Sequence, residues 1–171
     1  MDIRQETQED HSAISALTTL AFDGMPYAGG DEAEVVERLR AADALSLSLV
    51  AEEDGEVVGQ VTFSPAQLAD GSGPWFALGP VSVTPRRQGE GIGGALIRAG
   101  LEAIEHQGAL GCILTGNPDY YTRFGFVVSP QHCPENEPGE YFHLKLLGAS
   151  DAVGQFSFHP AFYGPVPAVG G

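Results

Sequence analysis

Four glycines, Gly89, Gly91, Gly93 and Gly94, lie within six residues of one another and directly follow Arg86, Arg87 and Gln88. Glycine lets backbone amides approach a ligand closely, and arginines add charged hydrogen-bond donors. Where such a segment opens a helix, unpaired amides and the helix dipole both favour an anion. The pattern therefore predicts a phosphate site, although the two arginines could equally be a solvated surface pair.

Two common phosphate-binding motifs fit this segment poorly. A P-loop needs Lys and then Ser or Thr after its last glycine, and Ala95 and Leu96 follow here. Gly89, Gly91 and Gly94 match the dinucleotide string G-x-G-x-x-G literally. That fold places its glycines after the first strand, with an acidic residue about 20 positions later, but this chain has several strands before the glycines and Leu114 and Thr115 after them.

A second motif favours another family. Residues 88–93 match the Q/R-x-x-G-x-G/A motif of the GNAT N-acetyltransferase superfamily, and residues 121–126 resemble its second signature, a Tyr four residues before Gly-Phe. The resemblance extends to about residue 158, and Leu78-Gly79-Pro80 with Tyr120-Tyr121 is most similar to the bacterial YhbS-type members. It implies one α/β (α+β) domain over residues 1–171, with a mixed, largely antiparallel central sheet and helices on both faces.

The resemblance also implies acetyl-CoA as cosubstrate and assigns roles around it. The backbone of Val81 and Val83 would pair with the pantetheine arm like an additional strand. Amides from Gln88 to Gly94 would hold the pyrophosphate, and Arg86 and Arg87 would contact the phosphates. Asn117 is a further cofactor candidate, although its spacing from the signature Tyr differs from the usual one.

The same resemblance points to a catalytic acid. In this superfamily the amine usually attacks the thioester directly, and a Tyr protonates the departing thiolate. Tyr121 occupies that position, with Tyr120 as the alternative donor. A Tyr in a short amphipathic helix can also be a packed core residue, which is the structural alternative for Tyr121.

The general base is not apparent from the sequence. Many relatives carry a Glu on the strand before the glycine turn, whereas residues 75–84 contain no acid and no His. Asp31 and Glu32 are candidates for holding a cationic amine, but acids in a first helical turn also favour the helix dipole. His132 and Cys133 are expected to be ordinary loop residues.

The elements that must position these residues follow from periodicity and turn signals. We expect Gly79-Pro80 to interrupt its strand as a bulge, 141–147 to pair with 153–158, and a partly ordered tail from Pro160. The pattern predicts helices at 8–22, 31–42, 92–107 and 117–124, and strands at 2–5, 46–53, 56–64, 75–83, 110–114, 141–147 and 153–158.

The amino-acid composition limits the kinds of partner that we expect this protein to bind. Eight basic against 23 acidic residues among 171 give a net charge of −15, which disfavours nucleic acid and anionic membranes. Cys112 and Cys133 show no disulfide or metal spacing, and the charged N-terminus lacks a signal peptide, so we expect a cytoplasmic protein without a metal. The oligomeric state stays open, with a homodimer among the options.

Together these features predict an acyltransferase that moves the acetyl group of acetyl-CoA to a primary amine. The alternative is a CoA-binding sensor or regulatory module that has lost turnover, which the missing strand Glu would favour. A nicotinamide-dependent oxidoreductase is a distant third interpretation. The sequence does not identify the acceptor amine.

Overall fold

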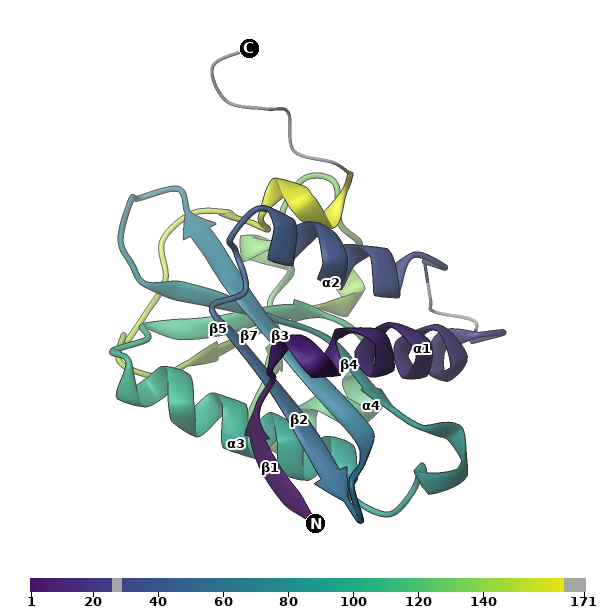
Figure 1. The fold of residues 1–171 in the computed structure, drawn as a ribbon. Coiled ribbons are helices and arrows are strands. Elements are labelled where there is room, and N and C mark those ends of the chain that lie inside the picture. Colours follow the sequence, from purple (N-terminus) through teal and green to yellow (C-terminus); the bar gives the residue numbers. More distant parts are fainter. Residues whose placement is uncertain (26–28, 165–171) are drawn as a thin grey trace.

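The computed structural model describes residues 1–25 and 29–164, and helices cover both faces of its central sheet (Figure 1). The strands are β1 Asp2–Gln5, β2 Leu47–Glu53, β3 Glu56–Leu68, β4 Trp75–Val83, β5 Gly111–Thr115, β6 Val127–Val128, β7 Phe142–Leu146 and β8 Phe156–Ser157. The α-helices are α1 His11–Phe22, α2 Glu32–Ala41, α3 Ile92–His106 and α4 Pro118–Tyr121. Short 3-10 turns are η1 Gln8–Asp10, η2 Pro85–Arg87, η3 Thr122–Phe124, η4 Pro130–His132, η5 Gly139–Tyr141 and η6 Pro160–Phe162.

The sheet is mixed and largely antiparallel, as predicted. Its strands follow the order β1-β2-β3-β4-β5-β7-β6, and β8 pairs with the far end of β3. All strand pairs are antiparallel except β4 with β5, which run parallel. The parallel pair requires a crossover, and this connection contains the glycine-rich segment and α3.

Alternating side chains on each strand divide the core between the two faces of the sheet. On β4, Phe76 and Leu78 pack in one cluster with the α3 residues Leu96 and Ile97, while Ala77 belongs to the cluster on the opposite face. Figure 1 shows α1 and α2 together on one face and α3 on the other. The expected two-sided coverage of the sheet is therefore confirmed.

The expected hairpin between residues 141–147 and 153–158 is wrong. Strand β7 already has β5 on one edge and β6 on the other, so neither edge is available to a third strand. Strand β3 continues four residues beyond the expected end at 64, to Leu68. Its extension accepts β8 through Gln67↔Ser157 and Leu68↔Phe156.

The segment from Pro160 is also more ordered than expected where the structure describes it. Turn η6 packs on α2, where Ala161 is completely buried beside Val35 and Leu39. The Arg38 Nε donates a hydrogen bond of 2.8 Å to the Ala161 carbonyl. Residues 165–171 of the expected tail lie outside the described residues.

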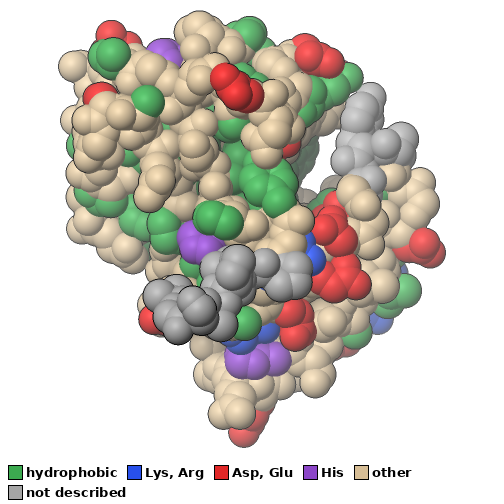
Figure 2. Space-filling view, turned by 90° about the horizontal axis from the view of Figure 1, so that it is seen from above, with side chains coloured by type: hydrophobic (Ala, Val, Ile, Leu, Met, Phe, Trp, Pro, Cys, Tyr) green, Lys and Arg blue, Asp and Glu red, His purple; other side chains and the backbone are tan. Residues whose placement is uncertain are grey.

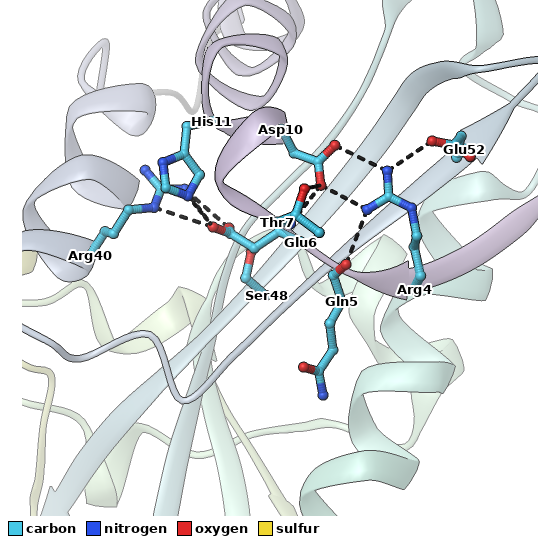
Figure 3. Close-up of polar contacts among 9 residues, drawn as sticks. All are labelled: Arg4, Gln5, Glu6, Thr7, Asp10, His11, Arg40, Ser48 and Glu52. Carbon is cyan, nitrogen blue, oxygen red and sulfur yellow. Dashed lines mark hydrogen bonds and ion pairs between the residues drawn. The ribbon is translucent and has the colours of Figure 1, made fainter.

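A polar cluster fixes the N-terminal strand to the helices (Figure 3). Arg4 bridges the Asp10 and Glu52 carboxylates at 2.7 and 2.8 Å, and the Thr7 amide donates to Asp10 at 2.7 Å. The Glu6 carboxylate receives the Arg40 guanidinium at 3.0 Å in a second group beside the first. These contacts hold β1 and the start of α1 against β2 and α2. Within the described residues, no helix has the length and apolar character needed to cross a membrane.

Candidate active site

Strands β4 and β5 separate after the first third of β4. Their pairing ends at Ala77↔Ile113, whereas the pairing of β4 with β3 continues to Val83. One edge of residues 78–83 therefore has no strand partner in the part of the chain that the structure describes. Since backbone amides and carbonyls need partners, this open edge is suited to an extended ligand with amide groups.

Buried polar side chains support the open part of β4 from the helix α1 side. The Gln60 Nε2 donates to the Ser82 Oγ at 2.8 Å and to the Pro80 carbonyl at 3.2 Å. The Ser82 hydroxyl also contacts the Thr18 hydroxyl at 2.9 Å. The β3–β4 register shifts opposite Gly79-Pro80, so the expected bulge is confirmed. Strand β4 is thus held in place although β5 no longer supports it.

The glycine segment lies where β4 ends and α3 begins. Gly89 and Gly91 have φ values of 84° and 85°, a backbone conformation in which other residues are strained. The first helical hydrogen bond of α3 runs from the Ala95 amide to the Gly91 carbonyl, at 3.0 Å. The amides of residues 92–94 therefore remain available at the positive end of the helix dipole.

A first cavity of about 520 Å³ joins the open β4 edge to this helix end. Of the predicted cofactor residues, Val81, Val83, Arg87, Gln88, Gly89, Gly91, Gly93 and Gly94 all line it. Residues Ala21, Phe22, Met25, Ser82, Ile92, Arg98, Tyr120, Tyr121, Arg123 and Phe124 complete its described lining. The structure therefore brings the two sequence motifs together around one cavity.

The two neighbouring arginines differ in position. Arg87 lines the first cavity and forms ion pairs with Glu53 and, at 3.0 Å, with Glu90. Its guanidinium lowers the pKa of the Glu53 carboxyl. Arg86 instead pairs with Glu56 at 2.7 Å, and its side chain is 57% exposed outside the described lining of the cavity. Arg87 is the better placed of the pair to meet a phosphate.

Two arginines that the sequence reasoning missed also line the first cavity. The Arg98 guanidinium carbon lies 4.9 Å from the Phe124 ring centre, and that of Arg123 lies 4.8 Å from the Tyr120 ring centre. Neither forms an ion pair with an acidic side chain among residues 1–25 and 29–164. Arg98 could have been found, because it follows Gly94 by one helical turn on the same face of α3.

Tyr121 lies in a cluster of rings with its hydroxyl unbonded. Its ring centre is 6.3 Å from that of Phe126 and 6.0 Å from that of His143, and no hydrogen bond to its hydroxyl is formed by the described residues. Burial raises the pKa of Tyr121, so the phenol keeps its proton at neutral pH. The ring is packed as the structural alternative expects, while the hydroxyl stays available for chemistry.

Tyr120 has a different orientation from Tyr121. A Cβ added at Gly93 would lie 3.1 Å from the Tyr120 hydroxyl, so this hydroxyl lies over the glycine segment. Tyr120 lines only the first cavity, whereas Tyr121 also lines a second one. Of the two tyrosines, Tyr121 is therefore the one located between the cavities.

The second cavity, of about 540 Å³, lies beside the first at the point where β4 and β5 separate. Phe22, Val81 and Tyr121 line both cavities. The end of the molecule seen in Figure 2 is hollowed, with hydrophobic side chains on one wall and acidic side chains gathered near the other. Three carboxylates, those of Asp31, Glu32 and Glu137, line the second cavity.

Asp31 and Glu32 reach this cavity as expected, but both already have partners. The Asp31 carboxylate pairs with Arg38 at 3.1 Å. The Glu32 carboxylate accepts hydrogen bonds from the amides of Gly29, at 2.6 Å, and Gly30, at 3.2 Å. Both side chains thus stabilise the start of α2, in line with the structural alternative that they serve the first helical turn.

Glu137 was not singled out from the sequence. It lies in the loop between β6 and β7, and its carboxylate accepts a hydrogen bond of 3.3 Å from the Thr115 hydroxyl at the end of β5. Burial raises the pKa of Glu137. No spacing or motif connects residue 137 with Tyr121, so only the fold reveals that both line the second cavity.

The remaining candidates have structural roles. The Asn117 side-chain oxygen accepts a hydrogen bond of 2.9 Å from the Asp119 amide, which caps α4, and Asn117 is outside the described lining of the first cavity. His132 contacts the Gly154 carbonyl at 2.7 Å, and the buried Cys133 thiol contacts the Glu137 carbonyl at 3.3 Å. Among the described residues, no cluster of three His, Cys, Asp or Glu side chains could hold a metal ion.

Relatives of known structure share this fold. A GNAT family acetyltransferase from Brucella melitensis, solved in complex with acetyl-CoA, is 45% identical with a TM-score of 0.83, covering 94% of this chain and 97% of that one. The GNAT family N-acetyltransferase YhbS from Escherichia coli, solved in complex with CoA, is 29% identical with a TM-score of 0.85, covering 94% and 91% of the two chains.

Sequence comparison gives the same family. The uncharacterized N-acetyltransferase YhbS of Escherichia coli K12 is 33% identical over 133 residues, which are 77% of this chain and 77% of the relative. The family model described as acetyltransferase (GNAT) domain matches residues 2–129. The expected resemblance is confirmed, and this chain belongs to the GNAT acetyltransferase family.

Proposed function

We propose that this protein transfers the acetyl group of acetyl-CoA to a primary amine that attacks the thioester directly. The observation that carries the proposal is the open edge of β4 beyond Ala77, which leads straight into the glycine segment at the start of α3. An amide-containing arm and a pyrophosphate are joined in this order in CoA. The solved complexes of the Brucella and Escherichia coli relatives with acetyl-CoA and CoA support this ligand.

The residues of the first cavity have separate tasks in this proposal. The backbone at Val81 and Val83 pairs with the pantetheine arm, which needs no particular side chain. The amides from Gln88 to Gly94 hold the pyrophosphate, and the side chain of Gln88 donates to the Val83 carbonyl at 3.1 Å, which ties this loop to β4. Arg87 adds a charged donor after exchanging its pairing with Glu90. Arg86 and Asn117 contribute less, because they lie outside the described lining of the cavity.

Bound acetyl-CoA supplies an activated acyl group. The amine nitrogen forms a bond to the carbonyl carbon, the carbon–sulfur bond breaks, and the sulfur keeps the bonding electrons. Tyr121 gives its phenolic proton to that sulfur, and the proton released by the nitrogen returns to the phenolate through solvent. A neutral amine and acetyl-CoA thus become an amide and CoA thiol, with Tyr121 restored.

The test is release of the CoA thiol from acetyl-CoA by a panel of primary amines, followed with a thiol reagent. We expect at least one amine to accelerate release over the amine-free rate and to yield its acetylated product by mass spectrometry. Tight binding of acetyl-CoA without release on any amine would favour a CoA-binding sensor instead. A rise in melting temperature with NADH but not with acetyl-CoA would refute both interpretations, since only a ligand of the native state stabilises it.

A further inference from the structure

The second cavity contains one carboxylate, that of Glu137, that has a single neutral hydrogen-bond donor among the described residues. Asp31 is paired with Arg38, and Glu32 is held by the amides of Gly29 and Gly30. Within residues 1–25 and 29–164, the Glu137 carboxylate accepts only the hydrogen bond from the neutral Thr115 hydroxyl, at 3.3 Å. A partly buried carboxylate without a cationic partner is unfavourable, and an incoming cation would relieve this cost.

The fold holds Glu137 at the place where the strands separate. Thr115 ends β5 just past the last residue that pairs with β4, so its hydroxyl fixes the Glu137 side chain at the opening between the two strands. The loop backbone is fixed as well, because the Cys133 thiol contacts the Glu137 carbonyl at 3.3 Å and the Glu137 amide donates to the Pro134 carbonyl at 3.1 Å.

The rest of the cavity wall is largely apolar. Six side chains from α1, α2, β4 and the C-terminal segment provide it: Phe22, Val35, Leu78, Pro80, Phe158 and Phe162. A volume of about 540 Å³ is within the range of small-molecule sites. This combination fits a small molecule with an ammonium group on an apolar body, and it disfavours a ligand that adds a carboxylate of its own.

We propose, on the basis of the function proposed above, that the second cavity binds the acceptor and that Glu137 binds its ammonium group and then takes its proton. The acceptor belongs to the class of small primary amines with an apolar body. The ammonium N–H bond breaks, its electrons stay on the nitrogen, and its proton moves to a Glu137 oxygen, from which it passes to solvent before the next turnover. The nitrogen lone pair released by this step faces the opening shared with the first cavity, where Tyr121 supplies the proton for the departing sulfur.

The surroundings of Glu137 suit this task. Burial raises the pKa of the Glu137 carboxyl, which makes the carboxylate a stronger base than an exposed Glu. The nearby groups that titrate or carry charge are Cys133 and Glu140 from the same loop, Tyr163 beyond α2, and Asp31, Glu32 and Tyr121 across the cavity. Three of these, Asp31, Glu32 and Glu140, are carboxyl groups that favour a cation in the site. The Cys133 thiol and the two phenols have raised pKa values and add no charge.

The binding test uses 2-phenylethylamine titrated calorimetrically into the CoA-loaded protein at pH 7. We expect Glu137→Gln to weaken binding about ten- to hundredfold, the usual worth of a hydrogen-bonded charged group. Glu135→Gln is the matched control, since it removes the same charge from the same loop outside the second cavity. Phenylalanine, which has the same body and an added carboxylate, should bind at least about tenfold more weakly than 2-phenylethylamine.

The kinetic test is the pH dependence of kcat/KM for 2-phenylethylamine. In the wild type we expect a plateau between the raised Glu137 pKa and the amine pKa, because the enzyme accepts the ammonium form. In Glu137→Gln only the free amine can react, so log kcat/KM should rise with pH at a slope of about one across pH 6 to 9. Equal binding and equal pH profiles in Glu137→Gln and wild type would overturn the role of Glu137.

Two outcomes separate this inference from the function on which it rests. Absence of 2-phenylethylamine binding to the wild type, with other amines still acetylated, would overturn the acceptor class and leave the transferase intact. Glu137-dependent binding without any thiol release would support the amine site and refute the acetyl transfer.

Discussion

Replacing Tyr121 by Phe tests the proposed acid with little structural disturbance. The ring is held by contacts that Phe can keep, with ring centres 5.0 Å from Tyr120 and 6.3 Å from Phe126. The hydroxyl forms no hydrogen bond with the described residues, so its removal leaves no unsatisfied partner there. We therefore expect the free energy of unfolding and the Kd for acetyl-CoA to stay close to their wild-type values.

The expected loss of activity follows from the chemistry of the departing group. A positioned general acid contributes about 10² to 10⁴ in rate. A thiol has a pKa of roughly 8.5, so at pH 7 the thiolate is already a fair leaving group and protonation helps less than it would for an alkoxide. We expect kcat to fall about a hundredfold, which corresponds to about 2.7 kcal/mol of transition-state stabilisation.

The assay is thiol release at saturating acetyl-CoA between pH 6 and 10, with acetyl-CoA affinity measured separately. Since burial raises the pKa of Tyr121, the wild type should show no loss of activity from phenol ionisation below about pH 10. Tyr120→Phe is the matched control, because its hydroxyl lies over Gly93 and should affect acetyl-CoA affinity more than kcat. An unchanged kcat in Tyr121→Phe at every pH would refute the assignment.

Two further predictions concern the arginine pair and the N-terminal cluster. Arg87→Ala should weaken acetyl-CoA binding by about three- to tenfold in calorimetry, because part of the Arg87 charge is already paired. Arg86→Ala should change the affinity less than about twofold, since Arg86 lies outside the described lining of the cavity. Equal effects of the two variants would contradict these positions of the side chains. Asp10→Asn should lower the free energy of unfolding by about 1–2 kcal/mol at pH 7, since the Arg4 guanidinium lowers the pKa of the buried Asp10 carboxyl to about 2. A group with a lowered pKa stabilises the native state at pH values above its pKa in the unfolded chain. The difference in the free energy of unfolding between Asp10→Asn and wild type, measured in urea, should therefore disappear as the pH falls from about 4 to 2. A difference that stays constant with pH would refute the role of the ion pair.

The sequence predicted the elements whose signals are local. The Asn117-Pro118 start of α4, the Asp54-Gly55 turn and the glycines before α3 each determine their own backbone, and the structure confirms all of them. The first cavity followed from the same kind of signal, since its glycine amides and β4 edge are contiguous in the chain. Local chemistry is sufficient where one segment makes a site.

Long-range pairing was less accessible. The residues of β7 and β8 alternate and are separated by a turn-like segment, which is the pattern of a hairpin. The pattern does not reveal that β5 and β6 occupy both edges of β7, or that β3 extends far enough to receive β8. Edge occupancy is a property of the whole sheet, so a pattern read along one segment does not determine it.

Strand β4 contains no acidic residue, so the proposed acid and the proposed base come from different elements. Gly79-Pro80 occupies the middle of the strand at the bulge, where the Pro80 carbonyl is held from behind by Gln60. Neither residue has a titratable side chain, so a base for the acceptor must come from another wall of the second cavity. The loop holding Glu137 is that wall, and it lies across the opening from Phe22 and α2. Tyr121 belongs to α4 and Glu137 to the β6–β7 loop, and Glu137 lies outside the described lining of the first cavity. Substitutions in the loop should therefore alter the choice of amine without altering the affinity for acetyl-CoA.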